Sequence, residues 1–250
     1  MRRSELSWIP NLLTGLNLFL GFWSILQMIE GNYLTACWLI VTASICDGLD
    51  GKLARWTRSA SPRGLQLDSL ADIVSFGAAP GVLLYFISFH KFGLAGVFLA
   101  ALPLLFGAIR LARFNRHATI AEKKGYVGLP IPMQAITITT FIIFNHALWG
   151  RLHLEFLLLP LTFFLAFLMV SHAPYEAMPR ITFRDSRKNL LKLITIIAGI
   201  SLIALNPAAI FFPLLMIYVL KGFAIMLFGL APSEDDLEPA SEEFEEKTIF

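Results

Sequence analysis

Charged residues are scarce in this sequence. Asp, Glu, Lys and Arg make up only 15% of its 250 residues, whereas 56% of the residues are hydrophobic. A soluble domain usually carries about 25% charged residues. Several apolar runs are also as long as the roughly 20 residues that a helix needs to cross a bilayer. The composition therefore excludes an ordinary soluble domain and predicts an integral membrane protein.

Cysteine and histidine are also few. Cys37 and Cys46 lie in one apolar stretch, too far apart on a rigid helix for a disulfide, and we expect both to be buried thiols. None of the five histidines has the spacing to a cysteine or carboxylate that would suit a zinc ion. No stretch combines basic and aromatic residues as nucleic-acid-binding surfaces do, so we expect no nucleic-acid partner.

The apolar stretches predict an all-α membrane bundle of about eight transmembrane helices. These helices would form one polytopic membrane domain over residues 1–230. Pro80, with Gly77 and Gly81, is expected to bend the third helix. The expected spans are residues 9–29, a second span from about 33, then 62–89, 94–111, 131–148, 154–170, 190–205 and 208–228.

Positive charge is distributed unevenly between the expected loops. Of the 20 Lys and Arg residues, only Lys91 and Arg151 fall in loops on one side of the membrane, and Lys221 falls within the last span. The positive-inside rule then places both termini in the cytoplasm, which predicts a protein of the cell (inner) membrane. Residues 231–250 are acidic and poor in bulky side chains, so we expect a disordered cytoplasmic tail.

Four aspartates stand at helical spacing around a polar turn. Asp47 and Asp50 end the second span, Asp68 and Asp72 begin the third, and residues 57–63 lie between the two pairs. At about 100° per residue, the members of each pair share a helix face, so a hairpin of these helices aims four carboxylates at one small volume. Four such charges need a counter-charge. Carboxylate oxygens suit hard cations such as Mg²⁺, Mn²⁺ or Ca²⁺.

These aspartates are expected to lie below the cytoplasmic membrane surface. The stretch 34–46 rises only about 20 Å, less than the roughly 30 Å of the hydrocarbon core. Acids at that depth usually face a bundle interior or an aqueous cavity. Ion pairs with Lys52 and Arg55 are the structural alternative, but two bases do not match four carboxylates. The motif helices, about residues 33–89, therefore predict a metal site.

Small residues beside the acids leave room for a bulky ligand. Gly51 and Ala54 follow the second aspartate on the same helix, and Gly64 lies four residues before the third. Such bare backbone lets a planar or phosphorylated ligand approach closely. Arg55 can neutralise phosphate oxygens with its planar fork of donors. Metal ions together with an arginine would suit a pyrophosphate.

Three polar side chains interrupt the first span: Asn11, Thr14 and Asn17. They would either form hydrogen bonds to neighbouring helices or contact a polar group of a substrate near the cytoplasmic interface. The sequence leaves both alternatives open.

The acidic pattern resembles the signature of a known family. It reads Asp-x2-Asp-Gly-x2-Ala-Arg-x8-Gly-x3-Asp-x3-Asp over residues 47–72 and is similar, at every defined position, to the motif of the CDP-alcohol phosphatidyltransferases. The resemblance implies a homodimeric enzyme in which an alcohol displaces CMP from a CDP-linked lipid, with two divalent ions, Mg²⁺ or Mn²⁺. The residue roles that it implies are metal ligation by Asp47, Asp50, Asp68 and Asp72, nucleotide and diphosphate binding by Gly51, Ala54, Arg55 and Gly64, and proton abstraction by Asp72.

Further segments are similar to the phosphatidylserine synthases of that family. They are residues 67–77, 111–115 and 128–132. The position after the fourth aspartate holds Ile73, where glycerol-phosphate users of the family often have a lysine. The likeness covers residues 8–135 and implies CDP-diacylglycerol and L-serine as substrates, CMP as product and lipids as surroundings. The serine carboxylate would then meet Arg110 or Arg113.

Two other functions stay open at this point. Another acceptor, glycerol 3-phosphate or an inositol phosphate, would use the same chemistry. A cation transporter or channel would also line its path with intramembrane carboxylates. Against a transporter, the acids occupy only the cytoplasmic half of the spans, and no inverted repeat is visible in the sequence.

Overall fold

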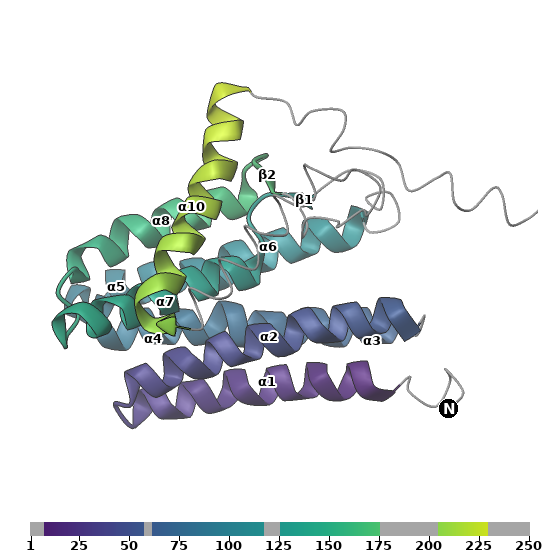
Figure 1. Cartoon of the computed structure of the whole chain (residues 1–250), viewed down its shortest axis with the longest axis horizontal. Coiled ribbons are helices and arrows are strands. Elements are labelled where there is room, and N and C mark those ends of the chain that lie inside the picture. The colour runs from purple at the N-terminus through teal and green to yellow at the C-terminus, as the bar shows by residue number, and fades with distance from the viewer. Residues whose placement is uncertain (1–7, 58–61, 118–125, 176–204, 230–250) are drawn as a thin grey trace, which may run out of the picture.

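The computed structural model describes residues 8–57, 62–117, 126–175 and 205–229, and these residues are almost entirely helical, as predicted (Figure 1). Its π-helical segment is η2, and η3 and η5 are short 3₁₀ helices. In chain order the elements are α1 (Trp8–Ile29), α2 (Tyr33–Thr57), α3 (Pro62–Asp72), η2 (Ile73–Ala78), α4 (Ala79–Ile87), η3 (Phe89–Phe92), α5 (Leu94–Ala100), α6 (Leu102–His117), β1 (Tyr126–Val127), α7 (Ile131–Trp149), η5 (Glu155–Leu157), α8 (Leu158–Val170), β2 (Pro174–Tyr175) and α10 (Pro207–Phe228).

Six helices of the described residues are long and apolar enough to cross a membrane. They are Pro10–Ile29, Tyr33–Ala54, Gly64–Ile87, Leu94–Phe114, Ile131–Trp149 and Pro207–Phe228. The predicted sixth span forms a shorter apolar helix, Glu155–Val170. The predicted seventh span, 190–205, and the acidic tail, 231–250, lie outside the described residues. The all-α membrane class is therefore supported, while the count of eight spans and the side of the termini stay predictions.

The first three spans form the part of the bundle that positions the acidic motif. Helices α1 and α2 are an antiparallel hairpin that lies side by side, and the third span, made of α3, η2 and α4, packs against α1 (Figure 1). Helix α2 ends and α3 begins at the right-hand end of the molecule in Figure 1, on the same side as β1 and β2. We call this the acidic end, because it carries the four aspartates.

The third span is irregular directly after the last aspartate. The irregular turn is the π-helical η2, which includes Gly77 and ends two residues before Pro80, and the predicted bend at Gly77, Pro80 and Gly81 stays a prediction. Gly77 and Gly81 allow close packing on the fourth span. A Cβ added at Gly77 would lie 3.2 Å from Leu104, and one at Gly81 would lie 2.5 Å from the carbonyl oxygen of Ala100. The glycines therefore bring two helices together, and a π turn, often found at functional sites, follows the acids.

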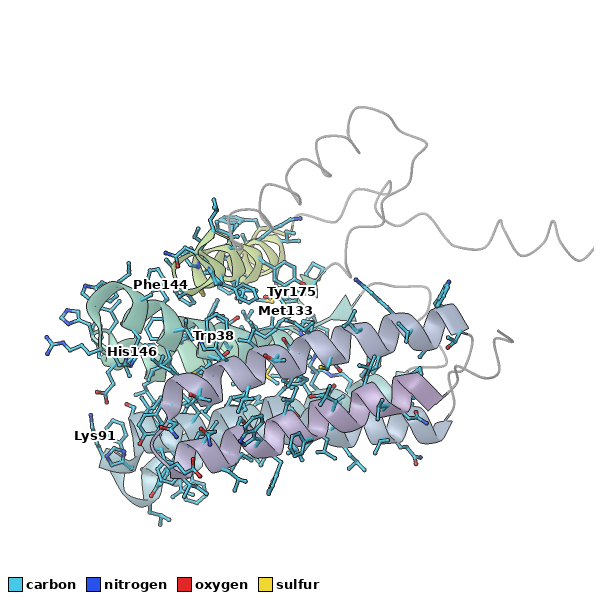
Figure 2. All side chains as sticks on the ribbon, turned by 60° about the horizontal axis from the view of Figure 1, so that its bottom comes forward. Trp38, Lys91, Met133, Phe144, His146 and Tyr175 are labelled. Carbon is cyan, nitrogen blue, oxygen red and sulfur yellow. The ribbon has the colours of Figure 1, made fainter. Side chains whose placement is uncertain are left out.

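A small two-stranded ladder lies beside α10 (Figure 1). Strand β1 pairs antiparallel with β2, so the segment before α7 is tied to the segment after α8. The hydroxyl of Tyr175 on β2 donates to the carbonyl oxygen of Val219 on α10 at 3.1 Å. Gly222 makes room for the Tyr175 ring, which lies beneath α10 in Figure 2. The tyrosine therefore attaches the last described helix to the ladder.

Polar side chains join two connections at the opposite end of the bundle. The ammonium group of Lys91 lies 2.5 Å from Oε1 of Glu155, and the hydroxyl of Ser88 donates to the same oxygen at 2.8 Å. Lys91 and His146 both lie at this end in Figure 2. These contacts link η3 to η5, far from the four aspartates.

Candidate metal and diphosphate site

The acidic hairpin brings its carboxylates together as predicted. Asp47 and Asp50 lie in the C-terminal part of α2, and Asp68 lies near the end of α3. One carboxylate oxygen from each of these three residues lies within 4.8 Å of the others. This spacing lets all three side chains contact one cation. The helical periodicity of the sequence was therefore a sufficient guide to this cluster.

Asp72 adjoins the same cluster from the last residue of α3. Its side chain is buried and lies against the side chain of Asp47. Asp72 thus adjoins one of the three clustered aspartates and can act in the same site.

Two carboxylate oxygens of the site have no partner within the described chain. They are Oδ1 of Asp68 and Oδ1 of Asp72, both shielded from solvent. A buried acceptor left without a hydrogen bond costs about 1–3 kcal/mol, and more when it is charged. A divalent cation would satisfy such oxygens, and an all-carboxylate set of donors suits a hard cation. The residues present therefore fit a divalent metal.

Asp50 is held by a residue of the first span. The buried hydroxyl of Thr14 lies 2.8 Å from Oδ2 of Asp50 and donates to it. For Thr14, the structure thus favours the interhelical hydrogen bond over the direct substrate contact. The sequence had left these two roles open.

The predicted diphosphate-binding residues lie on the same two helices. Gly51 and Ala54 follow the acids on α2, Gly64 lies in α3, and all three are half-buried. Arg55 lies on α2 between Ala54 and the end of the helix, and its side chain is outside what the structure describes. Small residues therefore flank the acidic cluster, and binding of a diphosphate there stays a prediction.

The two predicted acceptor arginines lie on α6. Arg110 is buried, and Arg113 is half-buried. Nη2 of Arg113 donates to the carbonyl oxygen of Val170, the last residue of α8, at 2.9 Å. A basic side chain commonly satisfies the terminal carbonyls of a helix in this way. Arg113 therefore has a structural contact that the sequence did not reveal, and its contact with an acceptor stays a prediction.

Two buried amides near the hairpin have no hydrogen-bond partner among the described residues. They are the side chains of Asn17 on α1 and Gln134 on α7, which are 0% and 1% exposed. Asn17 was among the polar residues of the first span noted in the sequence, whereas Gln134 was not predicted. A glutamine inside an apolar span was the available signal, since an amide there needs a partner or a ligand.

The fold and the site together define an integral membrane protein with an acidic cluster between two helices that could hold a metal ion. Residues 7–171 match the family described as CDP-alcohol phosphatidyltransferase. The chain belongs to this family, and it is an enzyme of this class, as the acidic signature predicted.

Several relatives are similar over long stretches of the chain. A protein of Helicobacter pylori named CDP-diacylglycerol–serine O-phosphatidyltransferase is 36% identical over 225 residues, which cover 88% of this chain and 91% of the relative. An archaetidylserine synthase of Methanothermobacter thermautotrophicus is 39% identical over 135 residues, covering 53% of this chain and 57% of the relative. A Bacillus subtilis protein with the same name as the first is 30% identical over 133 residues, covering 53% of this chain and 74% of the relative. The first likeness extends over almost the whole of both chains.

Proposed function

We propose that this protein transfers the phosphatidyl group of CDP-diacylglycerol to the hydroxyl of L-serine, giving phosphatidylserine and CMP. The observation that carries the proposal is the convergence of Asp47, Asp50 and Asp68, with Asp72 against them, in a chain of this family. The long likeness to a relative named for serine supports the acceptor. The reaction would take place in the cell (inner) membrane, with the site facing the cytoplasm, where nucleotide-activated substrates are found.

The four aspartates are the proposed ligands of two divalent cations, Mg²⁺ or Mn²⁺. Their carboxylate oxygens, two of which have no partner in the described chain, supply the donors. When bound, such ions neutralise a diphosphate and stabilise charge on the entering and leaving oxygens. Thr14 keeps Asp50 oriented for this task through its hydrogen bond.

The small residues on α2 and α3 bind the cytidine nucleotide and its diphosphate. Gly51, Ala54 and Gly64 present little side chain beside the acids, so the nucleotide can lie against the backbone. Arg55 contributes positive charge toward the phosphate oxygens. The diacylglycerol tails stay in the lipid while the nucleotide reaches the cytoplasmic surface.

Asp72 is the proposed base. Its carboxylate takes the proton of the serine hydroxyl, and the serine oxygen forms a bond to the β-phosphorus of CDP-diacylglycerol. The bond from that phosphorus to the bridging oxygen breaks, and CMP leaves with the electron pair. A positioned base of this kind contributes about 10²- to 10⁴-fold to a rate. The position of Asp72 directly beside Asp47, at the edge of the acidic cluster, supports this role.

Several further features belong to the same proposal. The catalytic unit would comprise residues 1–230, the tail 231–250 would be separate from it, and two copies would form a homodimer in the membrane. Arg110 or Arg113 would receive the serine carboxylate. Ile73, the residue after the fourth aspartate, does not offer the positive charge that an acceptor with its own phosphate would favour.

The test is product analysis with the purified full chain in lipid nanodiscs. CDP-diacylglycerol is supplied with Mn²⁺ or Mg²⁺ and with L-serine, glycerol 3-phosphate or inositol 1-phosphate, and CMP release and the lipid headgroup are measured. We expect CMP and phosphatidylserine with serine, loss of both with EDTA, and recovery when the metal is returned. Product with another acceptor instead would reassign the headgroup. Metal flux across liposomes without CMP release would favour the transporter.

A further inference from the structure

The buried amides of Asn17 and Gln134 are unusual within the described chain. Both polar atoms of each side chain are shielded from solvent and have no hydrogen-bond partner there. Other buried polar residues on the same two helices behave differently: Ser24 donates to the carbonyl oxygen of Gly21, and Thr139 donates to that of Ala135. A buried amide that satisfies none of its hydrogen bonds is expensive, which points to a ligand or water that binds there.

The backbone places Asn17 immediately behind the acidic cluster. It follows Thr14 on α1 by three residues, and Thr14 is bonded to Asp50. Its own carbonyl oxygen accepts a hydrogen bond of 2.9 Å from the hydroxyl of Ser75, which follows Asp72 by three residues. Three residues of helix rise about 4.5 Å. Asn17 thus lies about one helical turn from each of two aspartates of the site.

Gln134 comes from the helix that borders the same region on another side. It lies in the first turn of α7, which begins at the acidic end. Helix α7 packs against α2 and against η2, the irregular turn that follows Asp72. The two amides therefore belong to helices that both contact α2 and η2, and the helix of Asn17 also contacts α3.

We infer that Asn17 and Gln134 bind the polar group of the acceptor alcohol behind the metal site. The inference rests on the proposed function and extends it, because it names residues that recognise the acceptor. An amide offers N–H donors to a carboxylate and a carbonyl acceptor to an ammonium group. Two amides therefore match a small zwitterionic amino alcohol such as serine.

The two amides add selectivity to the arginine proposed for the serine carboxylate. Arg110 or Arg113 alone would suit a phosphate as well as a carboxylate, whereas an amide oxygen also accepts hydrogen bonds from an ammonium group. The neutral amides hold the ammonium end of the zwitterion without adding net charge beside four acidic side chains. The amides thus contribute selectivity for the amino alcohol rather than affinity for the nucleotide.

Replacement by apolar side chains of similar size tests the inference. Asn17→Leu and Gln134→Met remove the amides and keep the volume, and each is expected to raise the KM for L-serine about tenfold or more. The KM for CDP-diacylglycerol should stay within about twofold of wild type, since neither residue is assigned to the nucleotide. The matched controls are Ser24→Ala and Thr139→Val, which remove buried hydroxyls already bonded within α1 and α7.

A binding measurement gives a readout that does not depend on turnover. Saturating L-serine should raise the melting temperature of the wild-type protein and of both controls in the presence of a CDP-lipid and Ca²⁺, and this rise should be smaller in both amide variants. If the apolar variants do not accumulate, Asn17→Asp and Gln134→Glu replace them. Their added negative charge should also raise the KM for serine.

Each remaining outcome overturns one statement. If wild-type protein releases no CMP with any alcohol, the proposed function fails. If wild type uses serine while the amide variants keep its serine KM, the inference fails and the function stands. An unchanged serine KM with an altered melting temperature would mean that the amides bind structural water. An equal rise in the KM values for serine and CDP-diacylglycerol would mean that the amides maintain the shape of the whole site, and the inference fails.

Discussion

The hydroxyl of Thr14 on α1 donates a hydrogen bond of 2.8 Å to Oδ2 of Asp50 on α2. The bond is buried and joins residues that are 36 positions apart in the chain. It fixes one oxygen of an acidic residue that could otherwise rotate. The first span, which carries none of the aspartates, therefore takes part in shaping the acidic cluster.

Loss of this bond should weaken metal binding. Thr14→Val keeps the shape of the side chain but removes the donor, so Asp50 loses its fixed orientation. Removing such a partner of a metal ligand typically costs about 10- to 100-fold in affinity or activity. We expect a rise of this size in the Mn²⁺ concentration that gives half-maximal CMP release. Thr14→Ser retains the hydroxyl and should stay close to wild type; an equal rise in both variants would contradict the role of the hydrogen bond.

Neutralising either Asp47 or Asp68 should abolish metal-dependent activity. Each carboxylate contributes an oxygen to a cluster whose members lie within 4.8 Å of one another, so Asp47→Asn or Asp68→Asn removes a charged ligand. The measurements are CMP release and Mn²⁺ binding by the purified variant. Glu30→Gln is the matched control, since Glu30 is exposed at the opposite end of α1 and accepts a hydrogen bond from Gln27. Full activity of either aspartate variant would refute the metal assignment.

Asp72→Asn should stop turnover more than it weakens substrate binding. The variant keeps the size of the side chain and a hydrogen-bonding group toward Asp47, but it cannot accept the proton of the alcohol. We expect kcat to fall about 10²- to 10⁴-fold, while the dissociation constant for CDP-diacylglycerol changes only a few-fold. Stopped-assay kinetics and equilibrium binding of a CDP-lipid separate the two effects. Equal losses in both would argue against a role as base.

Arg113→Ala should destabilise the acidic end. The variant removes the donor to the carbonyl oxygen of Val170, and a lost hydrogen bond from a charged group costs about 1.5–3 kcal/mol. The melting temperature in detergent should therefore fall. Arg113→Lys can restore only part of it, because a lysine lacks the planar fork. An unchanged KM for serine in the alanine variant would remove Arg113 from the proposed acceptor site.

The link at the opposite end of the bundle should depend on pH. The hydrogen bond from Lys91 lowers the pKa of Glu155 below its ordinary value, although burial acts in the other direction. A carboxyl whose pKa is lowered by folding stabilises the protein above its unfolded pKa, and this contribution disappears as the pH falls through the folded pKa. Wild type should therefore melt at a higher temperature than Glu155→Gln at pH 7, and the difference should shrink as the pH falls from the ordinary pKa of a glutamate, about 4.3, through the lowered pKa of the folded state. A difference that persists at low pH would show that Glu155 acts by packing.

Local periodicity and distant packing were not equally predictable from the sequence. The spacing of Asp47, Asp50 and Asp68 was enough to predict their convergence, because each pair on a helix is set by the helix itself and the short turn brings the helices together. The family followed from the same spacing. By contrast, Thr14 meets Asp50, and Arg113 meets the carbonyl of Val170, only because separate helices pack in a particular register. No local sequence pattern encodes that register.

The third span shows the same limit in another form. Pro80 was a visible candidate for an irregularity, and the π turn lies directly before it and includes Gly77. The contacts of the turn were not visible in the sequence: Ser75 bonds to α1, and Gly77 lies against Leu104 of α6. These constraints come from two different helices. Their combination becomes visible only in three dimensions.

The π turn at Ile73–Ala78 also changes the direction in which the side chains after the turn point, relative to those before it. A π turn holds one residue more than an α turn, so the direction in which α4 presents its side chains is offset from that of α3. A substitution that changes the contact between Gly81 and the carbonyl oxygen of Ala100 is therefore expected to leave Asp68 and Asp72 facing α2. Removing a single residue from the turn would leave an ordinary α turn with α3 and α4 in place, whereas removing one from α4 would rotate the side chains beyond it by about 100° relative to the aspartates.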